Sequence, residues 1–94
     1  MGPSFEWDEE KAEANLKKHK IDFDEAMTVF LDPFSITIPD PDHSMNESRY
    51  VDIGSSEKGR VLVVVYTERG TNIRIISCRK ATPSEFRLYE EGHE

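Results

Sequence analysis

Residues 49–80 read RYVDIGSSEKGRVLVVVYTERGTNIRIISCRK, and this stretch decides the fold. Arg49–Ser55 alternates apolar and polar residues, as is typical of a strand with one buried face. Val61–Thr67 is continuously apolar and predicts a central strand that is buried on both faces. Ile73–Arg79 is a third apolar run, and short loops that contain glycine join the three runs. The stretch therefore predicts an antiparallel meander.

Two helices are expected before the meander. Asp8 can accept a backbone N–H that would otherwise lack a partner, which predicts a first helix that ends near His19. Asp22 can do the same for a second helix over residues 23–30. Asp32-Pro33 ends this helix, because proline disfavours helical backbone in the residue before it.

The first helix is expected to pack through an apolar stripe. Ala12, Leu16 and His19 follow one another at spacings of four and three residues, so they share one helical face. Phe5 and Trp7 precede the helix and are expected to fix its entry against the core.

The remaining elements complete an α+β domain. Ser35–Ile38 is a short β-branched run that predicts a fourth strand. Thr82-Pro83-Ser84-Glu85 has the pattern of a capping box with proline in the first helical position, and it predicts a helix to about Glu91. The order is two N-terminal helices, a four-stranded, mainly antiparallel sheet and a C-terminal helix, or ααββββα.

The length of 94 residues suits one domain, which we expect over residues 5–91. Residues 1–4 carry no pattern and are expected to be disordered or foreign to the natural chain, and residues 92–94 form an acidic tail. No run approaches the ~18 apolar residues of a membrane span, and no signal peptide is evident. We therefore expect a cytoplasmic protein without a membrane partner, and the lone Cys78 allows no internal disulfide.

The net charge of −7 is unevenly distributed along the chain. Residues 1–48 carry twelve acidic and four basic residues, whereas residues 49–89 carry four acidic and eight basic residues. The basic segment could bind nucleic acid. Alternatively, its arginines could be solvated and paired with nearby carboxylates.

Metal and cofactor sites are not expected. His19, His43 and His93 show no ligand spacing, and there is no cysteine pair. The sequence also lacks a glycine-rich phosphate loop and a nucleophile elbow.

The remaining candidate chemistry is RNA cleavage without a metal ion. Such cleavage needs a group that takes the 2′-hydroxyl proton, a cation that holds the phosphate, and a group that protonates the leaving oxygen. Arginine suits the second role because its planar fork matches two phosphate oxygens. Histidine, glutamate, lysine and tyrosine can share the other two roles. The candidates are Arg49, Arg69, Arg74, Arg79, Lys80, Ser77, Glu47 and Tyr89.

Strand geometry limits how these residues can combine. On an ideal strand Arg74 and Arg79 point to opposite faces, so both serve one site only if a bulge intervenes or Arg79 lies past the strand end. His19 is either a structural residue at the helix end or a catalytic one. Cys78 is expected to be a small core residue rather than a reactive thiol.

Three blocks of residues carry a resemblance to a known family. The first block comprises Phe5-Glu6-Trp7-Asp8, Lys11-Ala12, Asn15, Lys18-His19, Phe23, Glu25-Ala26, Phe30 and Asp32. The second comprises Glu47, Arg49, Gly54 and Gly59-Arg60, and the third comprises residues 64–67 (VVYT), residues 74–81 (RIISCRKA), Glu85 and Tyr89. Across residues 5–90 the chain resembles the BrnT family of ribonuclease toxins.

Two residues depart from the family pattern. Lys20 replaces a usual glycine, and Cys78 replaces a usual alanine. The first change removes an easy left-handed end for the helix, so the loop there is expected to differ.

The resemblance implies a fold similar to RelE-type ribonucleases and metal-independent endoribonuclease activity that halts translation. It also implies a BrnA-like ribbon-helix-helix antitoxin that masks the toxin in a hetero-oligomer. The complex would repress its own operon, so operator DNA would be contacted only through the antitoxin.

The resemblance also suggests roles for individual residues. Arg49, Arg74 and Arg79 are carried over as phosphate binders, with Glu47 or His19 as the proton acceptor. Further candidates for the site are Ser77, Lys80 and Tyr89. The Phe5/Trp7 and Phe86/Tyr89 groups are interpreted as core or antitoxin interface.

Two other functions stay open from the sequence. The chain could be a degenerate toxin that only binds its antitoxin, with the acidic residues 1–48 docking a basic partner. A sheet-face RNA-binding domain ranks last, because such domains stack bases on exposed aromatic residues and here only Tyr50 and Tyr66 lie in strands.

Overall fold

The computed structural model describes residues 4–40 and 49–92, so Glu47, His43 and His93 lie outside the described residues, as do residues 1–3. The elements in chain order are β1 (Ser4–Glu6), α1 (Glu9–His19), α2 (Phe23–Thr28), the 3-10 helix η1 (Val29–Leu31), β2 (Ile36–Pro39), β3 (Arg49–Ser55), β4 (Val61–Arg69), β5 (Asn72–Lys80) and α3 (Pro83–Glu91). The predicted α+β class, meander and C-terminal helix are confirmed. The second helix is shorter than predicted and continues as η1.

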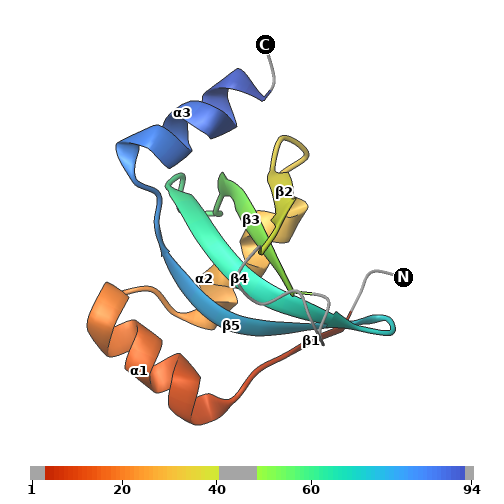
Figure 1. Cartoon of the computed structure of the whole chain (residues 1–94). Coiled ribbons are helices and arrows are strands. Elements are labelled where there is room, and N and C mark those ends of the chain that lie inside the picture. The colour runs from red at the N-terminus through yellow and green to blue at the C-terminus, as the bar shows by residue number, and fades with distance from the viewer. Residues whose placement is uncertain (1–3, 41–48, 93–94) are drawn as a thin grey trace.

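The sheet has five strands in the order β1-β5-β4-β3-β2, so the prediction of four strands was wrong. The missed strand is β1, which pairs in parallel with residues 72–74 of β5 (Figure 1). Ser4, which was predicted to lie outside the domain, is its first residue. Three residues are too few to show an alternating pattern, and their partner is distant in sequence.

A β-bulge in β5 changes which residues share a face. Val65 pairs with Ser77 and Tyr66 pairs with Ile75, so Ile76 is the extra residue. Ile75 and Cys78 are both buried in the same core, although an ideal strand would point them to opposite faces. Past the bulge, Arg79 therefore lies on the same face of the sheet as Arg74, opposite to the face that Ile75 and Cys78 bury in the core.

The main core lies between the sheet and the helical segment of α2 and η1, which Figure 1 shows behind the sheet. Its buried members are Ile21, Phe23, Ala26, Val29, Leu62, Val64, Tyr66, Ile75 and Cys78. Cys78 is a core residue, as predicted, and burial raises the pKa of its thiol to about 12.

The N-terminal aromatic residues fix the entry of α1, as predicted. The ring centroids of Phe5 and Phe30 are 5.2 Å apart, and those of Trp7 and Phe23 are 5.8 Å apart. Asp8 caps the helix by accepting hydrogen bonds from the backbone N–H groups of Glu10 and Lys11.

The helix α1 packs on the edge of β5 through a polar side chain. β1 covers only the first residues of this edge, and Asn15 serves as the partner further along. Its amide donates to Cys78 O at 2.9 Å and accepts from Cys78 N at 3.0 Å, as a neighbouring strand would. The predicted apolar stripe of α1 was therefore wrong in part, because Asn15 is buried while Leu16 is 47% exposed.

Lys20 ends α1 in the conformation that a glycine would adopt. Its φ of 61° is left-handed, and its N–H donates to Leu16 O at 2.9 Å. The substitution of the usual glycine therefore preserves the helix end, although left-handed backbone is unfavourable for a residue with a Cβ.

The helix α3 packs on the opposite face of the sheet from α2, near the β3–β4 hairpin. The predicted capping box is present, with Thr82 and Glu85 bonding each other's backbone N–H groups. Ile53 and Val63 are buried on this face. Among the described residues, no helix is long and apolar enough to cross a membrane.

Candidate functional site

The face of the sheet that carries α3 also carries the predicted phosphate binders. Arg49 and Arg74 lie toward the end away from α3, whereas Arg79 lies beside the start of α3. We call the part formed by Arg49, Thr67, Arg74, Ser77 and Arg79 the arginine face. Arg49, Thr67 and Arg74 lie in one cross-strand row of β3, β4 and β5. Neighbouring strands are about 4.8 Å apart, so the Cα atoms of the two arginines are about 10 Å apart.

Two of these arginines pair loosely with carboxylates. Arg49 Nε lies 3.4 Å from Asp40 Oδ2, and Arg74 Nη1 lies 3.1 Å from Glu6 Oε2. Partly exposed pairs of this kind contribute little stability and exchange readily with other anions. A guanidinium carries five donor hydrogens, so each arginine can bind a phosphate when its carboxylate moves away.

Arg79 is held more firmly. Its two terminal nitrogens donate to the two carboxylate oxygens of Glu85 at 2.7 and 2.8 Å. The hydrogen bonds from Arg79 lower the pKa of Glu85 to about 2. This bidentate pair links the end of β5 to the start of α3, so Arg79 has a structural role in the free protein.

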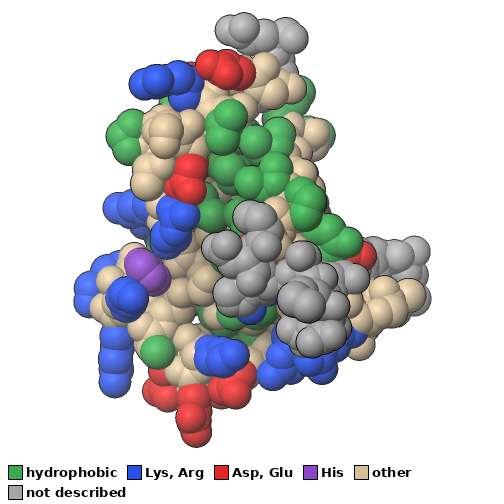
Figure 2. All heavy atoms as spheres, in the orientation of Figure 1, with side chains coloured by type: hydrophobic (Ala, Val, Ile, Leu, Met, Phe, Trp, Pro, Cys, Tyr) green, Lys and Arg blue, Asp and Glu red, His purple; other side chains and the backbone are tan. Residues whose placement is uncertain are grey.

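A basic pocket lies between α1 and β5, beside the arginine face. The described residues that line it are Lys11, Ala14, Asn15, Lys18, His19, Ile76 and Ser77. Ser77 belongs to both the pocket and the arginine face, which makes the two surfaces continuous. His19 is half-buried and lines the pocket together with Lys11 and Lys18, and Figure 2 shows lysine and arginine side chains gathered over α1. The ammonium groups of Lys11 and Lys18 lie in this lining, and none of the lining residues named above carries a carboxylate. This positive charge favours the binding of a phosphate.

The structure does not bring all predicted site residues together. Tyr89 donates to Asp32 Oδ2 at 2.6 Å, and Asp32 also accepts from Ser55 N at the far end of β3. Ser55 is six residues from Arg49 along the strand, or about 20 Å. Burial, followed by the bond to Asp32, raises the pKa of Tyr89 to about 12.

Lys80 is also separate from the arginine face. It pairs with Leu62, a residue of the main core, so its side chain starts on the face opposite to that of Arg79. Glu47, the predicted alternative to His19 as proton acceptor, lies outside the described residues.

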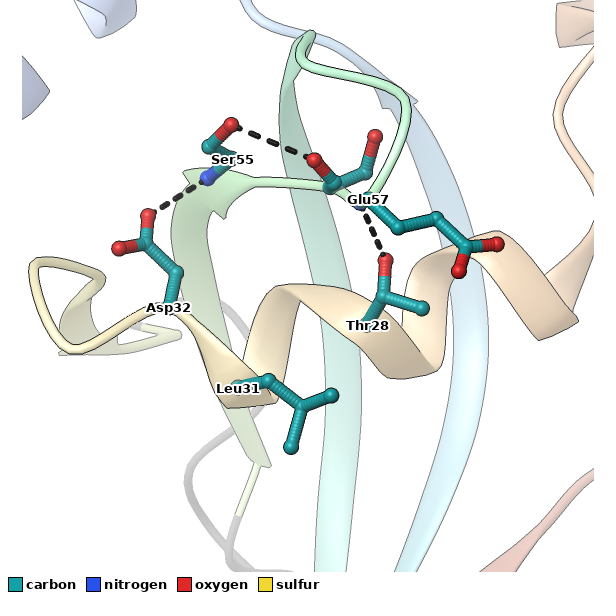
Figure 3. Close-up of a pocket in the computed structure, with 6 residues that line it drawn as sticks. Thr28, Leu31, Asp32, Ser55 and Glu57 are labelled. Atoms are coloured by element: carbon teal, nitrogen blue, oxygen red, sulfur yellow. Dashed lines mark hydrogen bonds between the residues drawn. The ribbon is translucent and has the colours of Figure 1, made fainter.

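Two other pockets formed by the described residues have the wrong charge for RNA. The one in Figure 3 lies between η1 and the β3–β4 loop, and the acidic residues Asp32 and Glu57 are among those that line it. A second one, between α1 and α2, is lined by Glu9, Glu13, Asp22 and Asp24 among others. Within residues 4–40 and 49–92, no group of His, Cys, Asp or Glu residues could hold a metal ion.

Sequence reasoning missed three residues of this surface. Lys11 and Lys18 are seven residues apart, or two helical turns, and this spacing already places them on one face. In the sequence analysis both lysines were used only as residues that carry the family resemblance. Thr67 ends an apolar run and carried no signal of its own.

Comparison with known proteins identifies the family. The family described as "Ribonuclease toxin, BrnT, of type II toxin-antitoxin system" matches residues 7–85. The chain belongs to the BrnT family. The fold is similar to the crystal structure of the Brucella abortus ribonuclease toxin BrnT, with a TM-score of 0.69 and 26% identity, over 85% of this chain and 97% of that chain. A comparison with curated protein sequences finds no match.

The predicted family is thereby confirmed. Membership of a type II toxin–antitoxin family implies an antitoxin as the partner of this chain.

Proposed function

We propose that this BrnT-family protein is an endoribonuclease that cleaves RNA without a metal ion at the arginine face and the pocket beside it. The observation that carries the proposal is the continuity of the two surfaces through Ser77. This continuity connects the row of Arg49, Thr67 and Arg74 on the sheet to the pocket that His19 lines. The reaction requires both a cation and a proton acceptor, and this continuous surface carries both kinds of group.

In the proposed reaction, His19 takes the proton of the 2′-hydroxyl group. The 2′-oxygen then attacks the adjacent phosphorus, and Arg49 and Arg74 stabilise the charge of the pentacovalent phosphate. The bond from phosphorus to the 5′-oxygen breaks and leaves a 2′,3′-cyclic phosphate. The leaving oxygen takes a proton from Lys11 or Lys18, whose ammonium groups line the same pocket.

We further propose that RNA cleavage inhibits translation in the cytoplasm and that a BrnA-like antitoxin neutralises the toxin. An apolar surface supports an interaction with such a partner. Phe34, Ile38, Phe86 and Leu88 are 43–54% exposed, and Figure 2 shows hydrophobic side chains gathered between α3 and the region of β2. Exposed apolar patches of this kind commonly mark protein interfaces. The complex would regulate its own operon through DNA contacts made by the antitoxin.

A second function is favoured by the ion pairs of the arginine face. Arg49, Arg74 and Arg79 each face a carboxylate, which reduces the positive charge available to RNA. A degenerate toxin that only binds its antitoxin would tolerate this neutralisation.

Cleavage of RNA by the purified, antitoxin-free protein in EDTA separates the two functions. We expect cleavage by the wild type, a loss of at least tenfold in Arg74→Ala, and no loss in Arg87→Ala. Arg87 is exposed on α3, so this control removes the same charge elsewhere. A folded wild type that binds antitoxin but leaves RNA intact would favour the second function.

A further inference from the structure

Two neighbouring polar atoms on the arginine face lack hydrogen-bond partners. Among the described residues, the buried side-chain nitrogen and oxygen atoms in this state are Arg49 Nε and Thr67 Oγ1. Arg49 and Thr67 are directly paired across β3 and β4, so both orphaned atoms belong to one place. Buried polar atoms without partners are uncommon in native proteins and often mark a site for water or a ligand.

The chemistry of the two atoms fits an oxygen-bearing anion. Arg49 Nε can only donate a hydrogen bond, whereas the hydroxyl of Thr67 can donate or accept. Arg74 follows in the same row on the other side of Thr67, so two guanidinium groups flank one hydroxyl. An oxygen of a phosphate can accept from all three groups, and the two positive charges favour it over water.

In the free protein the carboxylate of Asp40 lies near Arg49, where the phosphate would bind. Asp40 Oδ2 lies 3.4 Å from Arg49 Nε, which satisfies the charge but not the hydrogen bond. The Thr67 side chain is covered, because the residue is only 2% exposed. A phosphate that takes the place of Asp40 on Arg49 would reach Thr67 as the arginine side chain turns outward.

We propose that Thr67, together with Arg49 and Arg74, forms the binding site for a phosphate group of the RNA, with the Thr67 hydroxyl as a direct ligand. This inference rests on the proposed function of the arginine face and assigns a substrate contact to a residue of β4. It explains why a threonine with an unsatisfied hydroxyl stands where valine would pack equally well, since valine favours strands as threonine does.

Binding, stability and cleavage respond differently to substitutions at this position. Thr67→Val removes an unsatisfied buried hydroxyl and keeps the shape, so the melting temperature should stay equal or rise. Binding of an uncleavable 2′-O-methyl RNA, measured by fluorescence anisotropy, should weaken about tenfold, as expected for one lost hydrogen bond to a charged group. Thr67→Ser keeps the hydroxyl and should bind within about twofold of the wild type, although it loses a buried methyl group.

Two controls separate this proposal from the proposed function. Thr71→Val, at an exposed turn position, should not change binding. Inorganic phosphate should raise the melting temperature of the wild type and Thr67→Ser more than that of Thr67→Val, whether or not the protein cleaves RNA. Equal binding of RNA and phosphate by Thr67→Val and wild type overturns the proposal. A lower melting temperature of Thr67→Val with unchanged binding overturns it too, and indicates a structural water instead.

Discussion

Replacing Asn15 with leucine tests how α1 is held on the sheet. The Asn15 amide makes three hydrogen bonds of 2.9–3.0 Å, to Ile21 O, Cys78 O and Cys78 N. Each bond contributes about 1 kcal/mol, and a buried backbone group left without a partner costs at least as much. We therefore expect Asn15→Leu to lower the free energy of unfolding by about 3 kcal/mol, although leucine is the better helix former.

Urea denaturation followed by circular dichroism measures this loss. In a domain of this size, about 3 kcal/mol corresponds to a fall in melting temperature of at least ~12 °C. The matched control is Glu13→Leu at an exposed position of the same helix, which should stay within about 0.5 kcal/mol of the wild type. If Asn15→Leu is as stable as Glu13→Leu, the free edge of β5 is satisfied in another way and our account of α1 is wrong.

Three further predictions concern single residues. Lys20→Gly should stabilise the protein by about 1 kcal/mol in urea denaturation, because φ is 61° there, while a destabilised variant would contradict the left-handed helix end. Arg60→Met should cost about 3 kcal/mol in the same assay, because it leaves the buried carboxylate of Glu25 without its bidentate partner at 2.6 and 2.7 Å. A loss below about 1 kcal/mol would show that the pair is dispensable. Glu85 has a folded-state pKa lowered to about 2 from a usual 4.5, so its contribution to stability is present above pH 4.5 and is lost as the pH falls towards 2. Glu85→Gln should flatten the stability–pH curve in this window, and an unchanged slope would assign the dependence to other groups.

Much of the fold could be predicted from local patterns. The apolar runs of the meander, the caps at Asp8 and Asp22, and the capping box at Thr82 are each encoded within a few residues, and each was confirmed. Such signals predict structure well because each cap provides hydrogen-bond partners for backbone groups only a few residues away, whatever the tertiary contacts are.

The features that were missed depend on partners distant in sequence. β1 exists because residues 4–6 meet the edge of β5, and Asn15 is buried because α1 meets the same edge further along. The bulge at Ile76 leaves no pattern in an apolar run. Without knowledge of this bulge, the alternation of side chains along a strand could not show that Arg74 and Arg79 lie on the same face of the sheet.

The candidate site was predicted in part. Arg49, Arg74 and Ser77 lie on one surface, and His19 lies in the pocket beside it. Tyr89 and Lys80 lie elsewhere because α3 crosses the far end of the sheet and because Lys80 starts on the core face. Residue type and family resemblance selected candidates, but the distances between them follow from the sheet register.

The proposal that the 2′-hydroxyl attacks the phosphate on the arginine face is tested most directly by the ends of the RNA products. We predict that the wild-type protein in EDTA produces 2′,3′-cyclic phosphate and 5′-hydroxyl ends, and that a 2′-deoxy substitution at the cleavage position abolishes the cut. Products with 3′-hydroxyl and 5′-phosphate ends, or cleavage that persists at the 2′-deoxy position, would contradict the account.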